Sequence, residues 1–443
     1  MADLTALRRA ARRILDAAIA AGDAGALTRR ALRREGSRLR VADRTFDLER
    51  IRRVIVVGAG KASGAMAEAA ETVLEGVPLD GVVAVKERRD PGPRRVRVAE
   101  AGHPIPDARG EAAGQEILRL VRDAGPADLV LCLISGGGSA LTPAPVPGVT
   151  LGEKQAVTRL LLECGATINE LNAVRKHLSR LKGGQLARAA HPAPIIALLL
   201  SDVIGDPLDV IASGPTAPDP TTFGEALGIL DRFGLRARVP ASVRAHLEAG
   251  VRGEVEDTPK PGDPSLADVT NIVIGNNGLV VDAAVDEARR LGLAPCVLTR
   301  RLQGEAREVA RVFAALLDET ARGGLVSGRP ACLIAGGETT VTVRGRGTGG
   351  RCQELALAMV PELAAMRGVV VLAAGTDGSD GPTDAAGAVA DPTSFKRARQ
   401  KGLDARRALA ENDSHSFFAA LDDLVVTGPT GSNLMDVYLG LVG

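Results

Sequence analysis

The chain has 443 residues, 45% of them hydrophobic and 25% charged, which is typical of a soluble globular protein and long enough for two domains. Its 55 Lys and Arg against 54 Asp and Glu leave a formal net charge of +1, so no overall field directs it to nucleic acid or to a membrane. Aromatic residues make up 2% of the chain and Trp is absent, which removes the usual stacking platforms for single-stranded nucleic acid. We therefore expect neither nucleic acid nor a membrane as a partner.

The cysteines and the apolar runs indicate the cellular compartment in which the protein is expected. The five cysteines are scattered without a CxxC pair, which indicates buried thiols in a reducing compartment. No apolar run approaches transmembrane length, and the Arg-rich N-terminal segment has no signal-peptide core. These patterns predict a cytoplasmic protein. They leave the oligomeric state open, with a homodimer among the alternatives.

The first elements are a helix and a strand that ends in a glycine-rich turn. Apolar residues recur with helical spacing over residues 4–20, which predicts an amphipathic helix covering a sheet. From Ile51 follow an apolar strand, a turn and an Ala-rich helix. The turn resembles a dinucleotide fingerprint, but Ser63 stands where glycine is expected and the Walker A spacing is absent. What remains is a phosphate-compatible turn, whose candidate residues are Gly58, Gly60 and Lys61.

The apolar run over residues 129–134 leads into three consecutive glycines and a serine. Such glycines are costly in chain entropy, so at a strand end they indicate a function rather than a turn alone. Their backbone N–H groups would form an anion-binding nest for nucleotide phosphates. The candidate residues are Gly136, Gly137, Gly138 and Ser139.

A further apolar run, residues 195–200, precedes Asp202 and Asp206. In an open α/β sheet, ligands bind outside the carboxyl ends of the strands. Carboxylates at that position suit a hard cation that carries phosphate oxygens. We therefore expect both aspartates to be catalytic, with Asp202 a ligand of Mg²⁺.

The segment between these two strands carries basic residues at helical spacing. Residues 169–185 are expected to form one helix, which would place Arg175 and Lys182 on the same face. That face is either solvated or directed at an anionic ligand, with Arg175 as a substrate contact and Lys182 as a nucleotide contact. His103, before a proline, is interpreted as structural.

The second half repeats the alternation of apolar runs and helical patterns, which predicts a second α/β domain. Residues 339–343 alternate as an extended strand. Arg351 lies at the start of a helix, where its guanidinium could bind a carboxylate through two parallel hydrogen bonds. The remaining candidates are Gly337 and Glu338 for nucleotide binding, and Asp377 and Asp380 for metal binding.

A series of motifs covers nearly all of the sequence past residue 50: VGAGKASGAM, GHPIPD, SGGGSAL, LNAVRKHLSRLKGGQLA, SDVIGDPLDVIASGPT, GGETTVTV, GGRCQELAL, GTDGSDGPTDAAGA and GPTGSNLMD. In these motifs and in their order, the chain resembles the glycerate 2-kinase family. The resemblance implies that ATP, with Mg²⁺, phosphorylates the 2-hydroxyl of D-glycerate to give 2-phosphoglycerate and ADP. It also implies that Lys61 and Arg351 are active-site residues. Two positions depart from the family pattern, Pro207 in place of Asp and Cys352 in place of Asn.

The resemblance also implies an architecture of two α/β domains with the active site in the cleft between them. We expect a Rossmann-like glycerate kinase domain over residues 1–240, a linker over residues 241–266 and a MOFRL-type α/β domain over residues 267–443. The C-terminal tail is expected to pack back on the first domain.

Two other functions stay open from the sequence. Proteins of this family often carry the label hydroxypyruvate reductase, which would use NAD(P)H. The incomplete fingerprint, with no acidic residue at the end of the second strand to hold a ribose, gives that activity little support. A non-catalytic sugar-acid or nucleotide-binding protein would keep the glycine turns but would not need three clusters of Asp.

Overall fold

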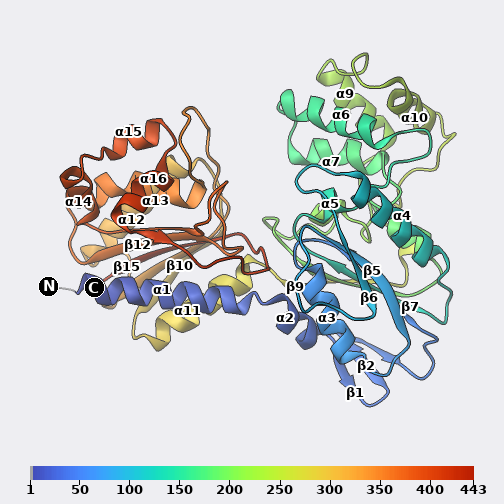
Figure 1. The fold of residues 1–443 in the computed structure, drawn as a ribbon, viewed down its shortest axis with the longest axis horizontal. Helices are drawn as coiled ribbons and strands as arrows, with labels where there is room; N and C mark the ends of the chain where they lie inside the picture. Colours follow the sequence, from blue (N-terminus) through green and yellow to red (C-terminus); the bar gives the residue numbers. More distant parts are fainter. Residues whose placement is uncertain (1–2) are drawn as a thin grey trace. The chain divides into compact units, whose positions relative to one another are not determined.

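The computed structural model describes residues 3–443, which divide into two compact units (Figure 1). The first unit comprises Ala24–Ile274. The second unit joins the N-terminal segment, up to Asp23, to Gly275–Gly443. The predicted α/β class is confirmed, because each unit is built on a six-stranded sheet with helices packed against it.

The sheet of the first unit has the order β6-β5-β4-β7-β8-β9. Strands β4, β7 and β8 are runs of six residues, all of them buried, as expected for strands covered on both faces. The pairs from β6 to β8 are parallel, and the chain reverses its direction across the sheet between β4 and β7. Ligands bind at the carboxyl ends of strands at such a reversal. The strands are β4 (Val54–Ala59), β5 (Leu79–Val85), β6 (Val96–Glu100), β7 (Leu129–Ile134), β8 (Ile195–Leu200) and β9 (Val269–Gly275).

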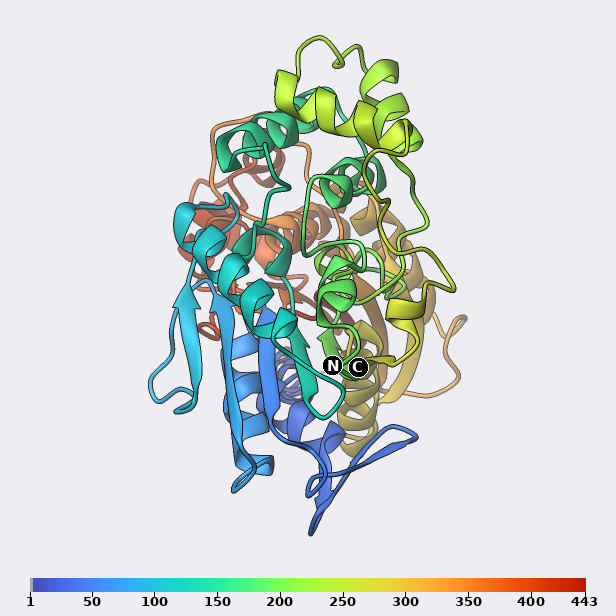
Figure 2. The ribbon, with the colours of Figure 1, turned by 90° about the vertical axis from the view of Figure 1, so that its right-hand side faces the viewer.

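Four helices form a separate layer beyond the carboxyl ends of these strands (Figures 1 and 2). They share a hydrophobic core of their own, and three of them begin with a Thr–Glu capping box, which satisfies N–H groups in their first turns. This layer, here called the helical layer, consists of α6 (Leu151–Glu163), α7 (Ile168–His177), α9 (Phe223–Arg232) and α10 (Ala241–Val251).

The rest of the first unit consists of short elements around the sheet. A three-stranded antiparallel sheet precedes β4, and its strands are β1 (Arg33–Glu35), β2 (Arg38–Val41) and β3 (Arg44–Asp47). The helices are α2 (Ala24–Ala31), α3 (Ser63–Val73), α4 (Ala108–Arg122), α5 (Gly138–Leu141) and α8 (Gln185–Ala190), with 3-10 turns η1 (Ile211–Ser213) and η2 (Pro264–Leu266).

The sheet of the second unit is mixed, in the order β10-β11-β15-β12-β13-β14. Its C-terminal strand β15 lies between β11 and β12 and pairs antiparallel with both. The expected packing of the tail on the first domain is therefore wrong, because all seven residues of β15 are buried within the second unit's own sheet. The strands are β10 (Ala294–Leu302), β11 (Ala331–Gly337), β12 (Val369–Gly375), β13 (Gly387–Ala390), β14 (Leu424–Val425) and β15 (Asp436–Val442).

Helices cover both faces of this sheet, with α1 and α11 on one side and the later helices on the other (Figure 1). The predicted N-terminal amphipathic helix is confirmed as α1, and it packs on β12 and β15. Arg8 of α1 forms ion pairs with Asp391 at 2.6 Å and with Asp423 at 2.7 Å. The helices are α1 (Leu4–Ala21), α11 (Asn277–Arg290), α12 (Ala306–Ala321), α13 (Arg351–Leu363), α14 (Ser394–Gln400), α15 (Ala405–Ala410) and α16 (Ser414–Leu421).

The observed division differs from the predicted domain boundaries at both ends. Helix α1 packs with the C-terminal unit, and β9 is the sixth strand of the first sheet, so the chain passes to the second unit near Gly275. The segment predicted as a linker, residues 241–266, contains α10 and η2. Its Pro- and Gly-rich part is held to the first unit by side-chain contacts of Asp257, Thr258 and Lys260.

Two predicted elements are wrong. The helix expected over residues 169–185 ends at His177, because Gly183 and Gly184 adopt positive φ and Ser179 forms a β-bridge with Pro145. The strand expected over residues 339–343 is absent from the described chain apart from one bridge, between Thr340 and Glu305. The threonines there bind other groups, since Thr342 donates to the Glu305 carboxylate.

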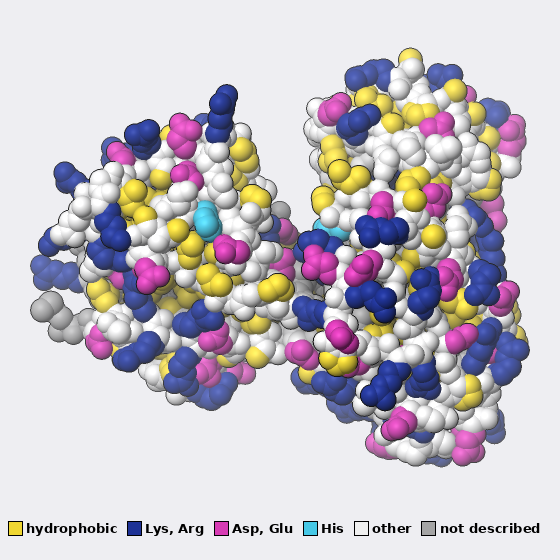
Figure 3. All heavy atoms as spheres, viewed as in Figure 1, with side chains coloured by type: hydrophobic (Ala, Val, Ile, Leu, Met, Phe, Trp, Pro, Cys, Tyr) yellow, Lys and Arg dark blue, Asp and Glu magenta, His cyan; other side chains and the backbone are white. Residues whose placement is uncertain are grey.

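Lys and Arg are interspersed with Asp and Glu over the surface of each unit on the face drawn in Figure 3. None of the helices within residues 3–443 combines the length and the apolar composition that a membrane crossing requires.

Candidate functional site

The turn after β4 is fixed to the end of β7. The Lys61 N–H donates to the Gly136 carbonyl at 2.9 Å, and the Ala62 N–H donates to Ser135 Oγ at 2.9 Å. A Cβ at Gly58 would overlap the Leu133 carbonyl oxygen, and one at Gly60 would overlap Ser135. The close approach of β4 to β7 therefore accounts for both glycines. It also places Lys61 at the edge of the loop that follows β7.

The loop Gly136–Ser139, here called the glycine loop, brings the candidates of three segments together. Gly137 has φ of 85°, and a Cβ there would lie 3.0 Å from the His103 ring and 3.7 Å from Lys61 Cγ. A Cβ at Gly136 would overlap the Asp202 carboxylate. Only glycine leaves room for Lys61, His103 and Asp202 to approach this loop. His103, expected to be structural, thus lies at the site, and burial together with the charges of Lys61 and Lys86 lowers its pKa.

Basic side chains converge on Ser139 from the segment predicted as one helix. Arg175 donates to Ser139 Oγ at 2.8 Å, and Lys182 Nζ donates to the Ser139 carbonyl at 2.8 Å. The Ser139 hydroxyl also lies 2.9 Å from that of Ser213, which donates to Asn172 at 3.0 Å. The two predicted basic contacts therefore meet at the glycine loop although no continuous helix joins them.

The segment after β8 is strained. Asp206, Ala212 and Ser213 have φ of 56°, 48° and 63°, a conformation that costs a non-glycine residue about 1 kcal/mol or more each. Backbone hydrogen bonds hold it, because the N–H groups of Gly183 and Gly184 donate to the carbonyls of Ser213 at 2.9 Å and Gly214 at 2.7 Å. This arrangement holds Ser213 against Ser139.

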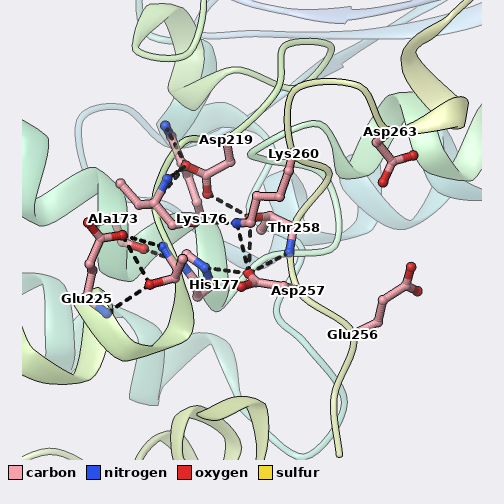
Figure 4. A network of polar contacts seen from close by, with 12 residues as sticks. Ala173, Lys176, His177, Asp219, Glu225, Glu256, Asp257, Thr258, Lys260 and Asp263 are labelled. Atoms are coloured by element: carbon pink, nitrogen blue, oxygen red, sulfur yellow. Dashed lines mark hydrogen bonds and ion pairs between the residues drawn. The ribbon is translucent and has the colours of Figure 1, made fainter. Parts of the chain in front are cut away.

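A buried polar network anchors the C-terminal end of α7, the helix that carries Arg175 (Figure 4). Lys176 is 2% exposed and pairs with Asp209 at 3.1 Å and with Asp219 at 3.3 Å. His177 Nε2 lies 2.9 Å from Asp257, which also accepts from Lys260 Nζ at 3.1 Å. Asp209, one of the three aspartates after β8, therefore has a structural partner.

Asp257 makes the stability of the first unit depend on pH. Burial alone would raise the Asp257 pKa, but hydrogen bonds from His177 and Lys260 lower it well below the usual range. Because the pKa is lower in the folded chain, this stabilisation is complete above about pH 4 and is lost as the pH falls further. We expect Asp257→Asn to lower the free energy of unfolding by about 1 to 2 kcal/mol at pH 7. The difference from wild type should shrink between about pH 4 and pH 2.

Urea unfolding followed by circular dichroism at several pH values measures this difference. Glu256→Gln is the matched control, since Glu256 is the neighbouring residue and its side chain is 78% exposed. A deficit for Asp257→Asn that stays constant down to pH 2 would contradict the linkage.

In the second unit, Arg351 starts α13 and its guanidinium is already paired within the chain. Its Nε and one NH2 group donate to the two oxygens of Asp436 at 2.6 and 2.9 Å, and its NH1 group lies 2.7 Å from Glu338. Asp436 is fully buried and also accepts from the Tyr438 hydroxyl at 2.9 Å. The bidentate edge that the sequence suggested for a substrate therefore binds Asp436, and the NH1 side faces the partly exposed Glu338.

Asp380 caps the same helix. Its oxygens accept from the backbone N–H groups of Cys352 at 3.1 Å and Gln353 at 2.8 Å, and from the Gln353 side chain at 3.1 Å. Burial raises the Asp380 pKa to about 6, because it outweighs the lowering by these hydrogen bonds and the nearby Asp436 charge adds to it. At position 352 the donor of this cap is the backbone N–H group, so the cap does not need the Cys352 thiol proton.

The remaining candidates lie close to these groups. Asp377 accepts from the Ser379 N–H at 3.1 Å, and a Cβ at Gly375 would lie 3.5 Å from Asp377 and 3.4 Å from Asp436. Gly337, with φ of 146°, packs against Leu302, since a Cβ there would overlap its backbone. Across residues 3–443 no three His, Cys, Asp or Glu side chains gather into a metal-binding group.

The sequence did not indicate the roles of several residues of these sites. Asn172, Ser213 and Asp436 fall within the motifs of the family resemblance, but Ser213 contacts Asn172 and Ser139, and Asp436 contacts Arg351, only in the fold. Lys154 and Tyr438 lie outside those motifs, and no local spacing signals them.

Comparison with known families and proteins finds matches over both units. Residues 10–248 match the family described as "Domain of unknown function (DUF4147)", and residues 331–436 match the MOFRL family. A glycerate 2-kinase from Pyrococcus horikoshii is 40% identical, and the match covers 98% of this chain and 97% of that protein. An Agrobacterium vitis protein with a provisional hydroxypyruvate reductase name is 44% identical over 88% of this chain and 100% of its own length. The crystal structure of a glycerate kinase from Thermotoga maritima matches with a TM-score of 0.88 and 39% identity, covering 99% of this chain and 100% of that one.

Proposed function

The chain belongs to the glycerate 2-kinase family, and from this premise we propose how its residues phosphorylate the 2-hydroxyl of D-glycerate. The reaction gives 2-phosphoglycerate, and ATP is the proposed phosphoryl donor. The observation that carries the proposal is the glycine loop, where Arg175 and Lys182 bind the hydroxyl and the carbonyl of Ser139 and Lys61 passes beside Gly137. Phosphoryl transfer depends mostly on positioning and on neutralising charge, and these groups supply both.

Each of these groups has a distinct part. The N–H groups of the glycine loop would bind phosphate oxygens, and Arg175 would orient the Ser139 hydroxyl toward them. Lys61 would stabilise the charge that develops on the transferring group. Asp202, beside Gly136, would hold the attacking hydroxyl or accept its proton.

The residues fit a magnesium ion that arrives with the nucleotide. Mg²⁺ usually keeps one or two carboxylate ligands and completes its shell with phosphate oxygens and water, so it needs no cluster of three acidic side chains. Asp202 and Asp206 are the proposed carboxylates, whereas Asp380 is committed to capping α13. When bound, the ion would neutralise phosphate charge.

Arg351 is the proposed contact for the glycerate carboxylate. Asp436 fixes the guanidinium from one side, and a substrate carboxylate would take the place of Glu338 on the NH1 edge. A substrate carboxylate there would be oriented by a side chain that has little freedom to move.

The test is an assay of the purified protein with D-glycerate, ATP and Mg²⁺, in which ³¹P NMR identifies the product. We expect 2-phosphoglycerate that depends on all three components. The name of the Agrobacterium vitis relative makes NADH-dependent reduction of hydroxypyruvate the second candidate, measured at 340 nm with the same protein. Reduction without glycerate phosphorylation would overturn the proposal.

A further inference from the structure

A cavity of about 580 Å³ lies in the first unit beside Ser139. Its wall is mostly apolar and comes from the segment Pro104–Pro106 and from one face of α6. Lys154 and Arg175 add positive charge to the lining, and Ser139 connects the cavity to the glycine loop. The volume is within the usual range for small-molecule sites, about 300 to 1,000 Å³.

Two buried cations near this cavity, Lys154 and Lys182, and the half-buried Arg175 have no carboxylate partner among residues 3–443. Lys154 is 6% exposed and donates to the Leu178 carbonyl at 2.8 Å, while Lys182 and Arg175 bind the carbonyl and the hydroxyl of Ser139. These neutral oxygens satisfy hydrogen bonds but do not balance the charge. Burial, and then the charge of Arg175, lowers the Lys154 pKa to about 7.

Lys176 provides the contrast within the same helical layer. It is buried to the same degree as Lys182, yet it has two carboxylate partners, Asp209 and Asp219. Buried charge is strongly destabilising unless an opposite charge compensates it. The uncompensated cations at the cavity therefore indicate that an anionic ligand completes the site.

We propose that the cavity is the nucleoside pocket of the phosphoryl donor, with its phosphate chain against Ser139, Arg175 and Lys154 and its base between Pro104–Pro106 and α6. This inference rests on the proposed function and specifies which part of the chain holds the nucleotide. The only carboxylate of the cavity wall in the described chain, Glu163, comes from the last turn of α6, whereas Lys154 comes from the first. Nine residues of helix separate them by roughly 13 Å. Arg159 also lines the wall between them but is exposed, so the buried Lys154, together with Arg175 at Ser139, favours one orientation of a ligand with one anionic end.

A steric block tests the apolar half. Gly152 lines the cavity, has no positive φ, and a Cβ there would meet nothing within 4 Å, so Gly152→Leu should fill the cavity without disturbing the fold. Gly228→Leu is the matched control, because Gly228 is also an exposed helical glycine with open space at its Cβ but lies outside the cavity wall. In calorimetric titration with ATP, we expect Gly152→Leu to weaken binding about tenfold or more and Gly228→Leu to bind as wild type does. Equal ATP affinity of Gly152→Leu and wild type would overturn the assignment.

A charge removal tests the anionic half. Lys154→Met keeps the length of the side chain, and we expect it to raise the melting temperature because a buried, uncompensated charge is removed. Inorganic tripolyphosphate has no nucleoside. Its affinity for Lys154→Met should be about tenfold weaker than for wild type, and its affinity for Gly152→Leu should equal that for wild type. Wild-type affinity of Lys154→Met for tripolyphosphate would remove Lys154 from the site.

These measurements separate the inference from the proposed function. Calorimetry measures ATP binding without catalysis. Weaker ATP binding by Gly152→Leu therefore supports the nucleoside pocket even if glycerate is not phosphorylated. Conversely, glycerate phosphorylation with wild-type ATP affinity in Gly152→Leu would leave the proposed function in place and overturn only the pocket. In the active enzyme, Gly152→Leu should raise the KM for ATP and leave the KM for glycerate within about twofold of wild type.

Discussion

Lys61→Met should lower kcat by about 100- to 1,000-fold, as removal of a transition-state stabiliser typically does. Lys61 lies in the turn after β4. Its backbone N–H donates to the Gly136 carbonyl, and its side chain passes beside Gly137. The backbone contact survives the substitution, so the glycine loop should keep its shape while the cationic group is lost. Because the charge is needed most when the phosphoryl group is in transit, kcat should fall more than the affinity for ATP.

Lys86→Met is the control for this experiment. Lys86 also influences the His103 pKa, but its side chain is 49% exposed and pairs with Glu87. Steady-state kinetics of both variants, with ATP affinity measured by calorimetry, should show a large loss for Lys61→Met alone. Comparable kcat values for the two variants would exclude Lys61 from the transfer step.

The sequence predicts the parts of the first unit that depend on local patterns. Apolar runs of six residues indicated β4, β7 and β8, and the three glycines after β7 indicated the loop that receives Lys61 and Asp202. These signals are local because a strand buried on both faces must be continuously apolar.

Other features depend on which segments meet in space. Helix α1 has the expected amphipathic pattern, but the pattern does not say which sheet it covers, and Arg8 finds its partners at Asp391 and Asp423. Likewise, no local pattern gives the central place of β15 in the second sheet, which follows from pairing with two distant strands.

The same reason explains what the sequence missed at the two sites. Arg351 was recognised from its place at a helix start, whereas its partner Asp436 is 85 residues away at the start of β15. Lys154 and Ser213 reach the glycine loop region from separate elements; Ser213 lies in a recognised motif that does not predict its contact with Ser139, and Lys154 lies in none. Predicting them needs the fold, because the chemistry is made by residues that are distant in the chain.

Arg351→Lys should lower kcat/KM for glycerate by about 100-fold and lower stability by a few kcal/mol, roughly 2 to 4, as losses at buried paired charges do. Lysine keeps the charge but cannot donate to both oxygens of Asp436 and also reach Glu338, as Arg351 does. The loss of orientation should raise the KM for glycerate and lower kcat together, with little change in the KM for ATP. Asp436→Asn should reproduce the kinetic loss in part, because Arg351 would then lack its charged anchor.

Arg346→Lys, an exposed arginine in the segment just before α13, is the matched control and should behave as wild type. Kinetics with varied glycerate and varied ATP, together with thermal unfolding of each variant, separate substrate binding from folding. A drop in melting temperature for Arg351→Lys with unchanged KM for glycerate would show that the guanidinium serves only to neutralise Asp436. A selective rise in the KM for glycerate over that for ATP, with folding intact at the assay temperature, would support a substrate carboxylate at Arg351.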